Sequence, residues 1–204
     1  MRTPDGQLMT WKQATLPLGS ALRIAPAFRA TAVADDISVE TTIEADYVPA
    51  AGGYRVTATA HRAVAPTTEI TPTVLRQVRL GEVLSAAVPY CVVVELDGTP
   101  VTVHDLTASE GRILPAWMAA ASAKAGPTAD TLELLQLVYG VAALAAQPPM
   151  RAVATEFNIP ERTATHWIAK ARRAGLLDGI TYAVGRQPDR NRRTGQRSAE
   201  SAVD

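Results

Sequence analysis

Residues 148–177 read PPMRAVATEFNIPERTATHWIAKARRAGLL, and the interpretation of the C-terminal part of the chain depends on this stretch. Two prolines at its start end any preceding helix and can open a new one, which we expect over 150–157. The tripeptide Asn-Ile-Pro at 158–160 is a turn signal, and a further helix is predicted over 161–174. The stretch therefore predicts two helices joined by a tight turn.

The spacing of small, turn and apolar residues is that of a helix-turn-helix unit. Such a unit needs a small residue where its two helices touch and a turn residue that accepts a left-handed conformation. Ala154 fits the first position and Asn158 the second. The side chains expected to hold the second helix in place are Val153, Phe157, Ile159, Ala164, Trp167 and Ile168. The remaining positions form a polar, net basic outer face.

This outer face suits the major groove of duplex DNA, which a recognition helix enters by its N-terminal turns. Arg162, Thr165 and His166 are the candidates for reading base edges, although His166 is equally well explained as a solvated helix residue. Basic side chains further along the helix suit phosphates. The full candidate DNA-binding set is Arg162, Thr163, Thr165, His166, Lys170, Arg172, Arg173 and Arg186.

A mostly buried helix and a basic tail are expected on either side of this unit. Thr128 or Asp130 can cap a helix that runs to about residue 146 and is apolar around most of its circumference. Residues 180–184 are interpreted as one strand of a small wing. Residues 186–204 lack any apolar period and are expected to be a disordered basic tail, which either solvates the chain or adds electrostatic affinity for DNA.

Charge is distributed unevenly along a chain whose formal net charge is zero. Residues 1–127 carry 10 Lys and Arg against 12 Asp and Glu, and residues 128–204 carry 10 against 8. Between Lys170 and Arg197 there are eight basic residues and two acidic ones. The neutral total argues against a nucleic-acid binder, but the local excess of positive charge supports one.

The N-terminal part shows the period of two that strands have when one face is buried. Residues 37–46 alternate in this way, and Gly52-Gly53 leads into a second alternating run at 54–61. We expect an antiparallel hairpin here. Thr71 and Pro72 open a helical stretch that reaches residue 84 and that Gly81 can divide in two.

A second hairpin is predicted for strands 90–96 and 100–104, which flank Asp97-Gly98. The predicted fold class is α+β: a mixed domain of antiparallel hairpins and helix followed by an all-α helix-turn-helix domain. The boundaries are set by composition: the α+β domain over 1–115, a featureless alanine-rich linker over 116–127 ending in Gly-Pro, the helix-turn-helix domain over 128–185, and the tail over 186–204.

An enzyme is not expected. The acidic residues Asp35, Asp36, Glu40, Glu44 and Asp46 could form a metal or acid-base cluster, but on the strand interpretation Glu40, Glu44 and Asp46 form a solvated face. No Walker loop, nucleophile elbow or nucleotide-binding glycine motif is present. Cys91, the single cysteine, and the strand residues His61 and His104 lack further ligands at metal spacing, so no metal or cofactor is predicted.

A cytoplasmic location is expected. The N-terminus lacks the apolar run of a signal peptide, and no stretch reaches the ~18 apolar residues that cross a bilayer. No contact with a membrane is therefore predicted.

Residues 151–177 resemble the helix-turn-helix segments of small regulators in actinobacteria and their phages and plasmids. The stretch EITPTVLRQVRLGEV at 69–83 also looks like one that precedes such units, which extends the resemblance to about 69–180. Asn158 stands where these segments usually have Gly, and Pro160 where they have Ser or Thr. The resemblance implies binding to double-stranded DNA.

Three functions remain open. The leading hypothesis is a sequence-specific transcriptional regulator that acts as a homodimer on two half-sites, with the N-terminal domain serving dimerisation, effector sensing or partner contact. The second is a phage or plasmid packaging or recombination adaptor that holds DNA for another enzyme. The third is a module whose helices contact another protein and never meet DNA, in which case the unit is an ordinary helical hairpin.

Overall fold

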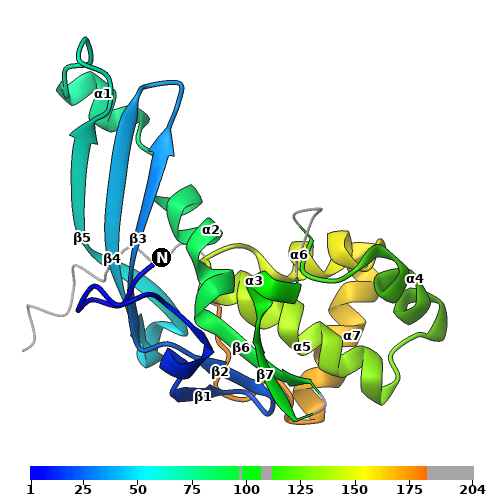
Figure 1. Ribbon diagram of the computed structural model, residues 1–204. Helices are drawn as coiled ribbons and strands as arrows, with labels where there is room; N and C mark the ends of the chain where they lie inside the picture. Colours follow the sequence, from blue (N-terminus) through cyan, green and yellow to red (C-terminus); the bar gives the residue numbers. More distant parts are fainter. Residues whose placement is uncertain (97, 107–111, 183–204) are drawn as a thin grey trace, which may run out of the picture.

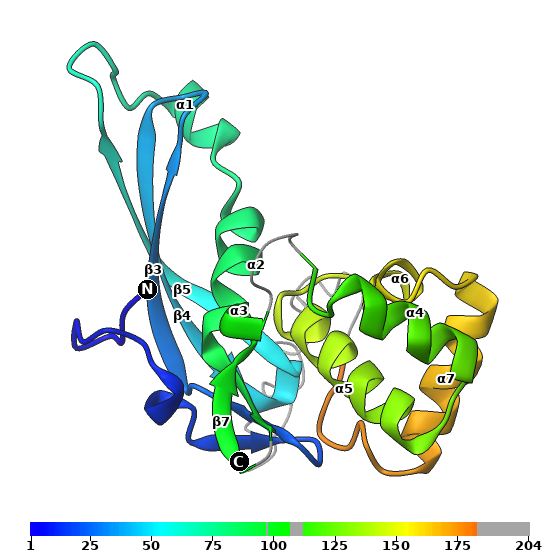
Figure 2. The ribbon, with the colours of Figure 1, turned by 45° about the vertical axis from the view of Figure 1, so that its right-hand side comes forward.

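The computed structural model describes residues 1–96, 98–106 and 112–182. These residues form two antiparallel sheets and a group of helices, which confirms the predicted α+β class. The longer sheet lies at one side of the molecule, and the helices of the C-terminal part lie at the other side (Figure 1). A helix and the smaller sheet lie between them, and the turned view in Figure 2 shows the same order.

The longer sheet is a three-stranded arm whose far half extends beyond the smaller sheet and the C-terminal helices (Figure 2). Its middle strand has the predicted alternation, since Val39, Thr41, Ile43 and Ala45 are buried and their neighbours are more exposed. Gly52, with φ at 67°, ends a short 3-10 turn and leads into the third strand, so the first predicted hairpin is confirmed. The elements, in sheet order, are β3 (Ala27–Ala34), β4 (Val39–Val48) and β5 (Gly53–Ala63), with η2 (Pro49–Ala51) in the second turn.

A β-bulge in this sheet breaks the alternation predicted over 54–61. Glu44 pairs with Ala58 and Ala45 pairs with Val56, so Thr57 has no partner across the strand. An extra residue moves the following side chains to the opposite face. As a result His61 lies opposite buried Thr41, and its Nδ1 lies 3.1 Å from the Thr41 hydroxyl.

Two helices follow the arm, as the Thr71-Pro72 start predicts. The Thr71 hydroxyl accepts a hydrogen bond from the amide of Val74 and caps the first helix. The break between the helices falls at residues 78–79, and Gly81 lies inside the second helix, so the predicted division at Gly81 is wrong. The second helix buries side chains at spacings of three and four, and this pattern continues as far as Cys91. Residues 90 and 91 are therefore helical, whereas the sequence predicts a strand there. The helices are α1 (Pro72–Gln77) and α2 (Leu80–Cys91), and the residues that α2 buries are Leu84, Ala87, Val88 and Cys91.

The smaller sheet contains the second predicted hairpin, β6–β7, on the described residues either side of position 97. The strand predicted over 100–104 ends at Thr102, because a short helix begins at Val103. His104 therefore lies in a helix, and its ring stacks on Tyr90 with the centroids 3.7 Å apart. The elements are β1 (Leu16–Leu18), β2 (Leu22–Ile24), β6 (Val92–Leu96), β7 (Thr99–Thr102) and α3 (Val103–Leu106), with η1 (Trp11–Gln13) before β1, and the sheet order is β1-β2-β6-β7.

The segment predicted as a linker contains a helix. Alanine has the highest intrinsic helix propensity, which explains why this alanine-rich stretch is helical after Pro115. Ala119 and Ser122 on this helix are buried. The next helix begins after Thr128, whose hydroxyl accepts from the Thr131 amide as predicted. The C-terminal helices are α4 (Ala116–Ala125), α5 (Ala129–Leu144), α6 (Pro149–Glu156) and α7 (Glu161–Arg173).

One continuous apolar core runs from the arm to the C-terminal helices and includes Phe28, Val88, Leu135 and Trp167. Helix α5 is buried around most of its circumference, as its sequence predicts. Ile180, 2% exposed, also joins this core. The wing strand predicted to begin there is wrong for residues 180–182, which are irregular, because Ile180 packs inward; positions 183–184 lie outside the described residues.

None of the helices among the described residues is long and apolar enough to span a membrane.

Candidate nucleic-acid interface

The turn between α6 and α7 has the left-handed residue that the sequence predicts. Asn158 has φ at 51°, and its amide donates to the Thr155 carbonyl at 3.2 Å. The amide of Ile159 donates to the Ala154 carbonyl at 3.0 Å. This pair of bonds is a Schellman motif, which satisfies carbonyl groups left free at the end of α6. The turn therefore directs the chain into α7 with a defined geometry.

Helix α7 is held against the scaffold by the apolar residues predicted for this role. The rings of Phe157 and Trp167 meet edge to face with their centroids 5.8 Å apart. Ala164 is fully buried, and Ala154 is 8% exposed, as expected for the small residue between the helices. Figure 2 shows α5, α6 and α7 as one group.

The outermost face of α7 carries two arginines and a histidine. Arg162, His166, Ala169 and Arg173 follow the spacing i, i+4, i+7, i+11, opposite the buried side chains, and all four are exposed. Neither Arg162 nor His166 has a hydrogen-bond or ion-pair partner in the described part of the chain. Their side chains are therefore available to a ligand.

The other predicted contact residues on α7 lie at the flanks of this face, and most of them already have partners. The Thr165 hydroxyl donates to the Glu161 carbonyl at 2.9 Å, and Thr163 is half-buried. Lys170 donates through Nζ to the Pro127 carbonyl at 2.6 Å. On the outermost face, Arg173 donates through Nε to the Ala169 carbonyl at 3.4 Å. The structure therefore separates the predicted set into an outermost face, where Arg162 and His166 have no described partner, and two flanks.

Arg172 is the predicted residue most strongly held within the protein. Its Nη2 donates to the Tyr139 hydroxyl at 2.7 Å, and its guanidinium carbon lies 5.7 Å from the centre of that ring. This contact ties the end of α7 to α5. Arg186, also in the predicted set, lies outside the described residues.

Contacts that the sequence does not predict join the end of α6 to residues 112 and 114, which precede α4. The guanidinium of Arg112 donates to the backbone carbonyl of Glu156. The Glu156 carboxylate lies 3.6 Å from Arg112 Nε and accepts the Leu114 amide at 2.8 Å. No local pattern could have predicted these contacts, because more than forty positions separate the partners in the sequence.

Two of the acidic residues considered as a catalytic cluster form ion pairs on the outer face of the arm. Glu40 pairs with Arg62, and Glu44 pairs with Arg29. Asp46 is exposed. No group of three or more metal-ligating side chains is found among the described residues. The arm face is therefore a salt-bridged, solvated surface, as the strand interpretation predicts.

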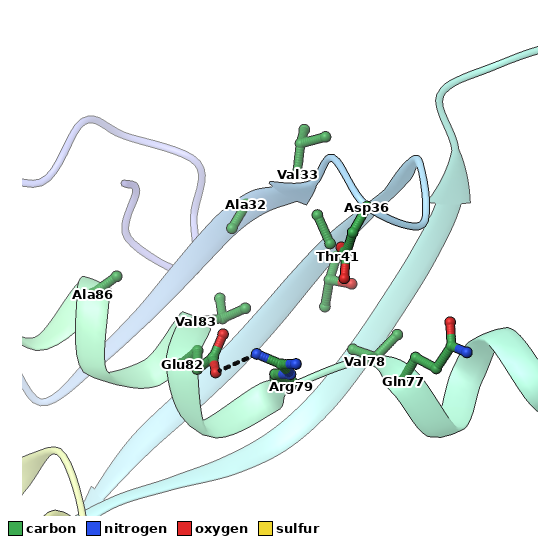
Figure 3. A pocket seen from close by; sticks show the side chains of 11 residues that line it. Ala32, Val33, Asp36, Thr41, Gln77, Val78, Arg79, Glu82, Val83 and Ala86 are labelled. Carbon is green, nitrogen blue, oxygen red and sulfur yellow. Dashed lines mark hydrogen bonds and ion pairs between the residues drawn. The ribbon is translucent and has the colours of Figure 1, made fainter.

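The arm also has a hollow, of about 300 Å³, on the face that α1 and α2 cover (Figure 3). Its walls are mainly Val and Ala side chains from β3 and α2, with Thr41 and Asp36 on the sheet side. Arg79 and Glu82 pair with each other at its edge, 3.1 Å apart.

A comparison with known proteins finds no family model, no curated protein and no solved structure that matches this chain. The resemblance over 151–177 to regulators of actinobacteria and their phages therefore stays a prediction.

Proposed function

We propose that this chain binds duplex DNA through α7 and acts as a sequence-specific regulator of transcription. The observation that carries the proposal is that Arg162 and His166 are exposed and have no partner among the described residues, on a helix whose entry is fixed by the Asn158 turn. Arginine can bond a guanine edge through two parallel hydrogen bonds, and histidine can reach a base or a phosphate. We assign base reading to these two residues.

Phosphate contacts are assigned to the C-terminal half of the same helix. Arg173 lies on the outermost face, and Lys170 lies on one flank. Arg172 supports the interface by holding α7 to Tyr139 and adds positive charge there. Phosphate contacts fix register and supply sequence-independent affinity, whereas base contacts supply specificity.

The regulator is proposed to work as a homodimer in the cytoplasm. One recognition helix buries too little surface for useful specificity, so two copies bound to two half-sites are expected. The same geometry would also serve an adaptor that holds DNA for another enzyme. A compact footprint with two half-sites supports the regulator, and a long footprint of low specificity supports the adaptor.

A protein-contact role for the helical group is favoured by one specific observation. Trp117 on α4 is 71% exposed, and large exposed aromatic side chains are enriched in protein interfaces. In that case DNA would not bind, and charge reversal at Arg173, which is exposed and takes no part in the Tyr139 contact, would leave the function intact.

The deciding experiment is a salt titration of DNA binding. The full chain is titrated with random-sequence duplexes and with genomic fragments selected for binding, and fluorescence anisotropy reports the affinity. The proposal predicts binding that weakens steeply with salt and prefers the selected fragments. Arg162→Ala should remove that preference, while Arg76→Ala on α1, also exposed, should leave it unchanged. No binding at low salt would reject the proposal.

A further inference from the structure

A second pocket lies where the N-terminal part of the fold meets the helix-turn-helix unit. It has a volume of about 380 Å³ and is lined by residues of α2, α5 and α6. Its apolar lining includes Pro89 from α2, Val138 and Ala142 from α5, and Ala152 from α6. This volume lies in the range of small-molecule sites, which are mostly apolar with a few polar groups that orient the ligand.

The polar groups in this lining include one charge that the fold leaves free. Glu156 is neutralised by Arg112 and accepts the Leu114 amide. Gln147 uses its amide nitrogen to donate to the Ser85 hydroxyl at 2.9 Å. Arg151 has neither an ion pair nor a hydrogen bond with any described residue, although it lies beside an apolar lining.

We infer that this pocket binds a small carboxylate with an apolar body. The carboxylate pairs with the guanidinium of Arg151, which matches a carboxylate through two parallel hydrogen bonds. The apolar body lies on the lining formed by α2 and α5. The hydroxyl of Thr155 and the side-chain oxygen of Gln147, neither of which bonds to another described residue, are available to a further polar group on the ligand.

The position of the pocket connects it to DNA binding, and this part of the inference rests on the proposed function. A ligand here touches α2 on one side and α6 on the other, next to the hydrogen bond that joins Ser85 to Gln147. Helix α6 packs against α7 and precedes it in the helix-turn-helix unit. If the ligand changes DNA affinity, DNA must change ligand affinity by the same factor.

The ligand site can be tested without DNA. Isothermal titration calorimetry of the full chain uses two carboxylates as probes, phenylacetate and 4-methylpentanoate. The control is 2-phenylethanol, an uncharged analogue of phenylacetate. The carboxylates should bind at least about tenfold more tightly than the alcohol, because a hydrogen bond to a charged group contributes more than one to a neutral group. Arg151→Gln should remove this difference, and Arg76→Gln, exposed on α1, should preserve it.

A second variant tests the apolar lining with Arg151 in place. Ala152→Leu adds bulk inside the pocket from a half-buried position and should abolish binding of both carboxylates, with an unchanged circular dichroism spectrum as the check on folding. Absence of carboxylate binding to the unmodified chain, or full binding to Ala152→Leu, overturns the inference.

The outcome that reassigns Arg151 is also distinguishable. If Arg151→Gln weakens salt-dependent DNA binding and leaves carboxylate affinity unchanged, Arg151 contacts phosphate and the inference is wrong. Carboxylate binding that needs Arg151, in a chain that binds no DNA, supports the pocket and rejects the proposed function. Carboxylate binding that changes DNA affinity supports both.

Discussion

The guanidinium of Arg172 donates a 2.7 Å hydrogen bond to the hydroxyl of Tyr139, which joins the C-terminal end of α7 to the buried helix α5. Tyr139 is 4% exposed, and its hydroxyl has no other partner among the described residues, so loss of this arginine would leave the hydroxyl unpaired within that part of the chain. Arg172 therefore has a structural role as well as a positive charge.

Replacing Tyr139 by Phe should lower the free energy of unfolding by about 1 kcal/mol, the net contribution of one hydrogen bond. Urea denaturation followed by circular dichroism measures the change. Tyr182→Phe is the control, since Tyr182 is half-buried and its hydroxyl has no described hydrogen bond. An equal loss in both variants would mean that the bond to Arg172 contributes nothing.

The two arginines 162 and 172 should differ in their effect on DNA. On the proposed function, Arg162→Ala should cost about 1–3 kcal/mol of specific binding and relax preference at one base position, because it would remove the proposed bidentate base contact. Arg172→Ala should weaken binding to all sequences alike and should also lower stability. Competition against single-base operator variants measures the first effect. Uniform loss with Arg162→Ala would assign that residue to phosphate.

Asn158→Gly should stabilise the protein by a few tenths of a kcal/mol up to about 1, since glycine adopts a positive φ without the strain of a side chain. The same change at Ala169, in the exposed interior of α7, should destabilise by about 1 kcal/mol. Melting temperatures of the two variants test the pair. Shifts of the same sign would contradict the left-handed turn.

Gly52→Ala and Gly81→Ala should also shift stability in opposite directions. A Cβ at Gly52 would overlap the Thr181 backbone, and φ there is 67°, so a loss of about 2 kcal/mol or more is expected. Gly81 lies in α2, and a Cβ there would meet no atom within 4 Å, so the free energy of unfolding should rise by about 0.5–1 kcal/mol. Denaturant midpoints of both variants provide the measurement.

Stability should fall as the pH rises above about 9. Burial raises the pKa of the Cys91 thiol above its ordinary value of 9.0, and burial likewise raises the pKa of the Tyr54 hydroxyl above 10.0. Below these ordinary values both groups are protonated in both states. Above them only the unfolded chain loses the protons, which favours unfolding. Urea midpoints measured between pH 7 and 10.5 test this. The midpoint of Cys91→Ala should be lower than that of the unmodified chain at pH 7 but should fall less steeply as the pH rises.

Local pattern predicted the helix-turn-helix region well, because each signal acts over a few residues. Asn158 takes the left-handed conformation, Thr128 caps α5, and Trp167 packs inward on α7. In these cases the residue type restricts the backbone or the buried face directly.

The errors occur where tertiary packing decides the structure. The sequence predicts strands at Cys91 and at Ile180, yet Cys91 extends α2 and Ile180 enters the core beside α5. The bulge at Thr57 and the held side chains of Lys170 and Arg172 likewise depend on residues distant in sequence. A single sequence carries no signal for such partners.

The close approach of α5 to the smaller sheet has a practical consequence. A Cβ on Gly140 would lie 2.6 Å from a methyl group of Leu22 and 3.6 Å from one of Ile180. Leu22 belongs to β2 and Ile180 follows α7, so both ends of the chain pack against α5 at this glycine. Cutting the chain near residue 127 would expose that apolar seam on both fragments. The helices α5 to α7 should therefore not fold as an independent unit: a fusion or truncation that carries them alone should precipitate, and co-expressed halves should be recovered together.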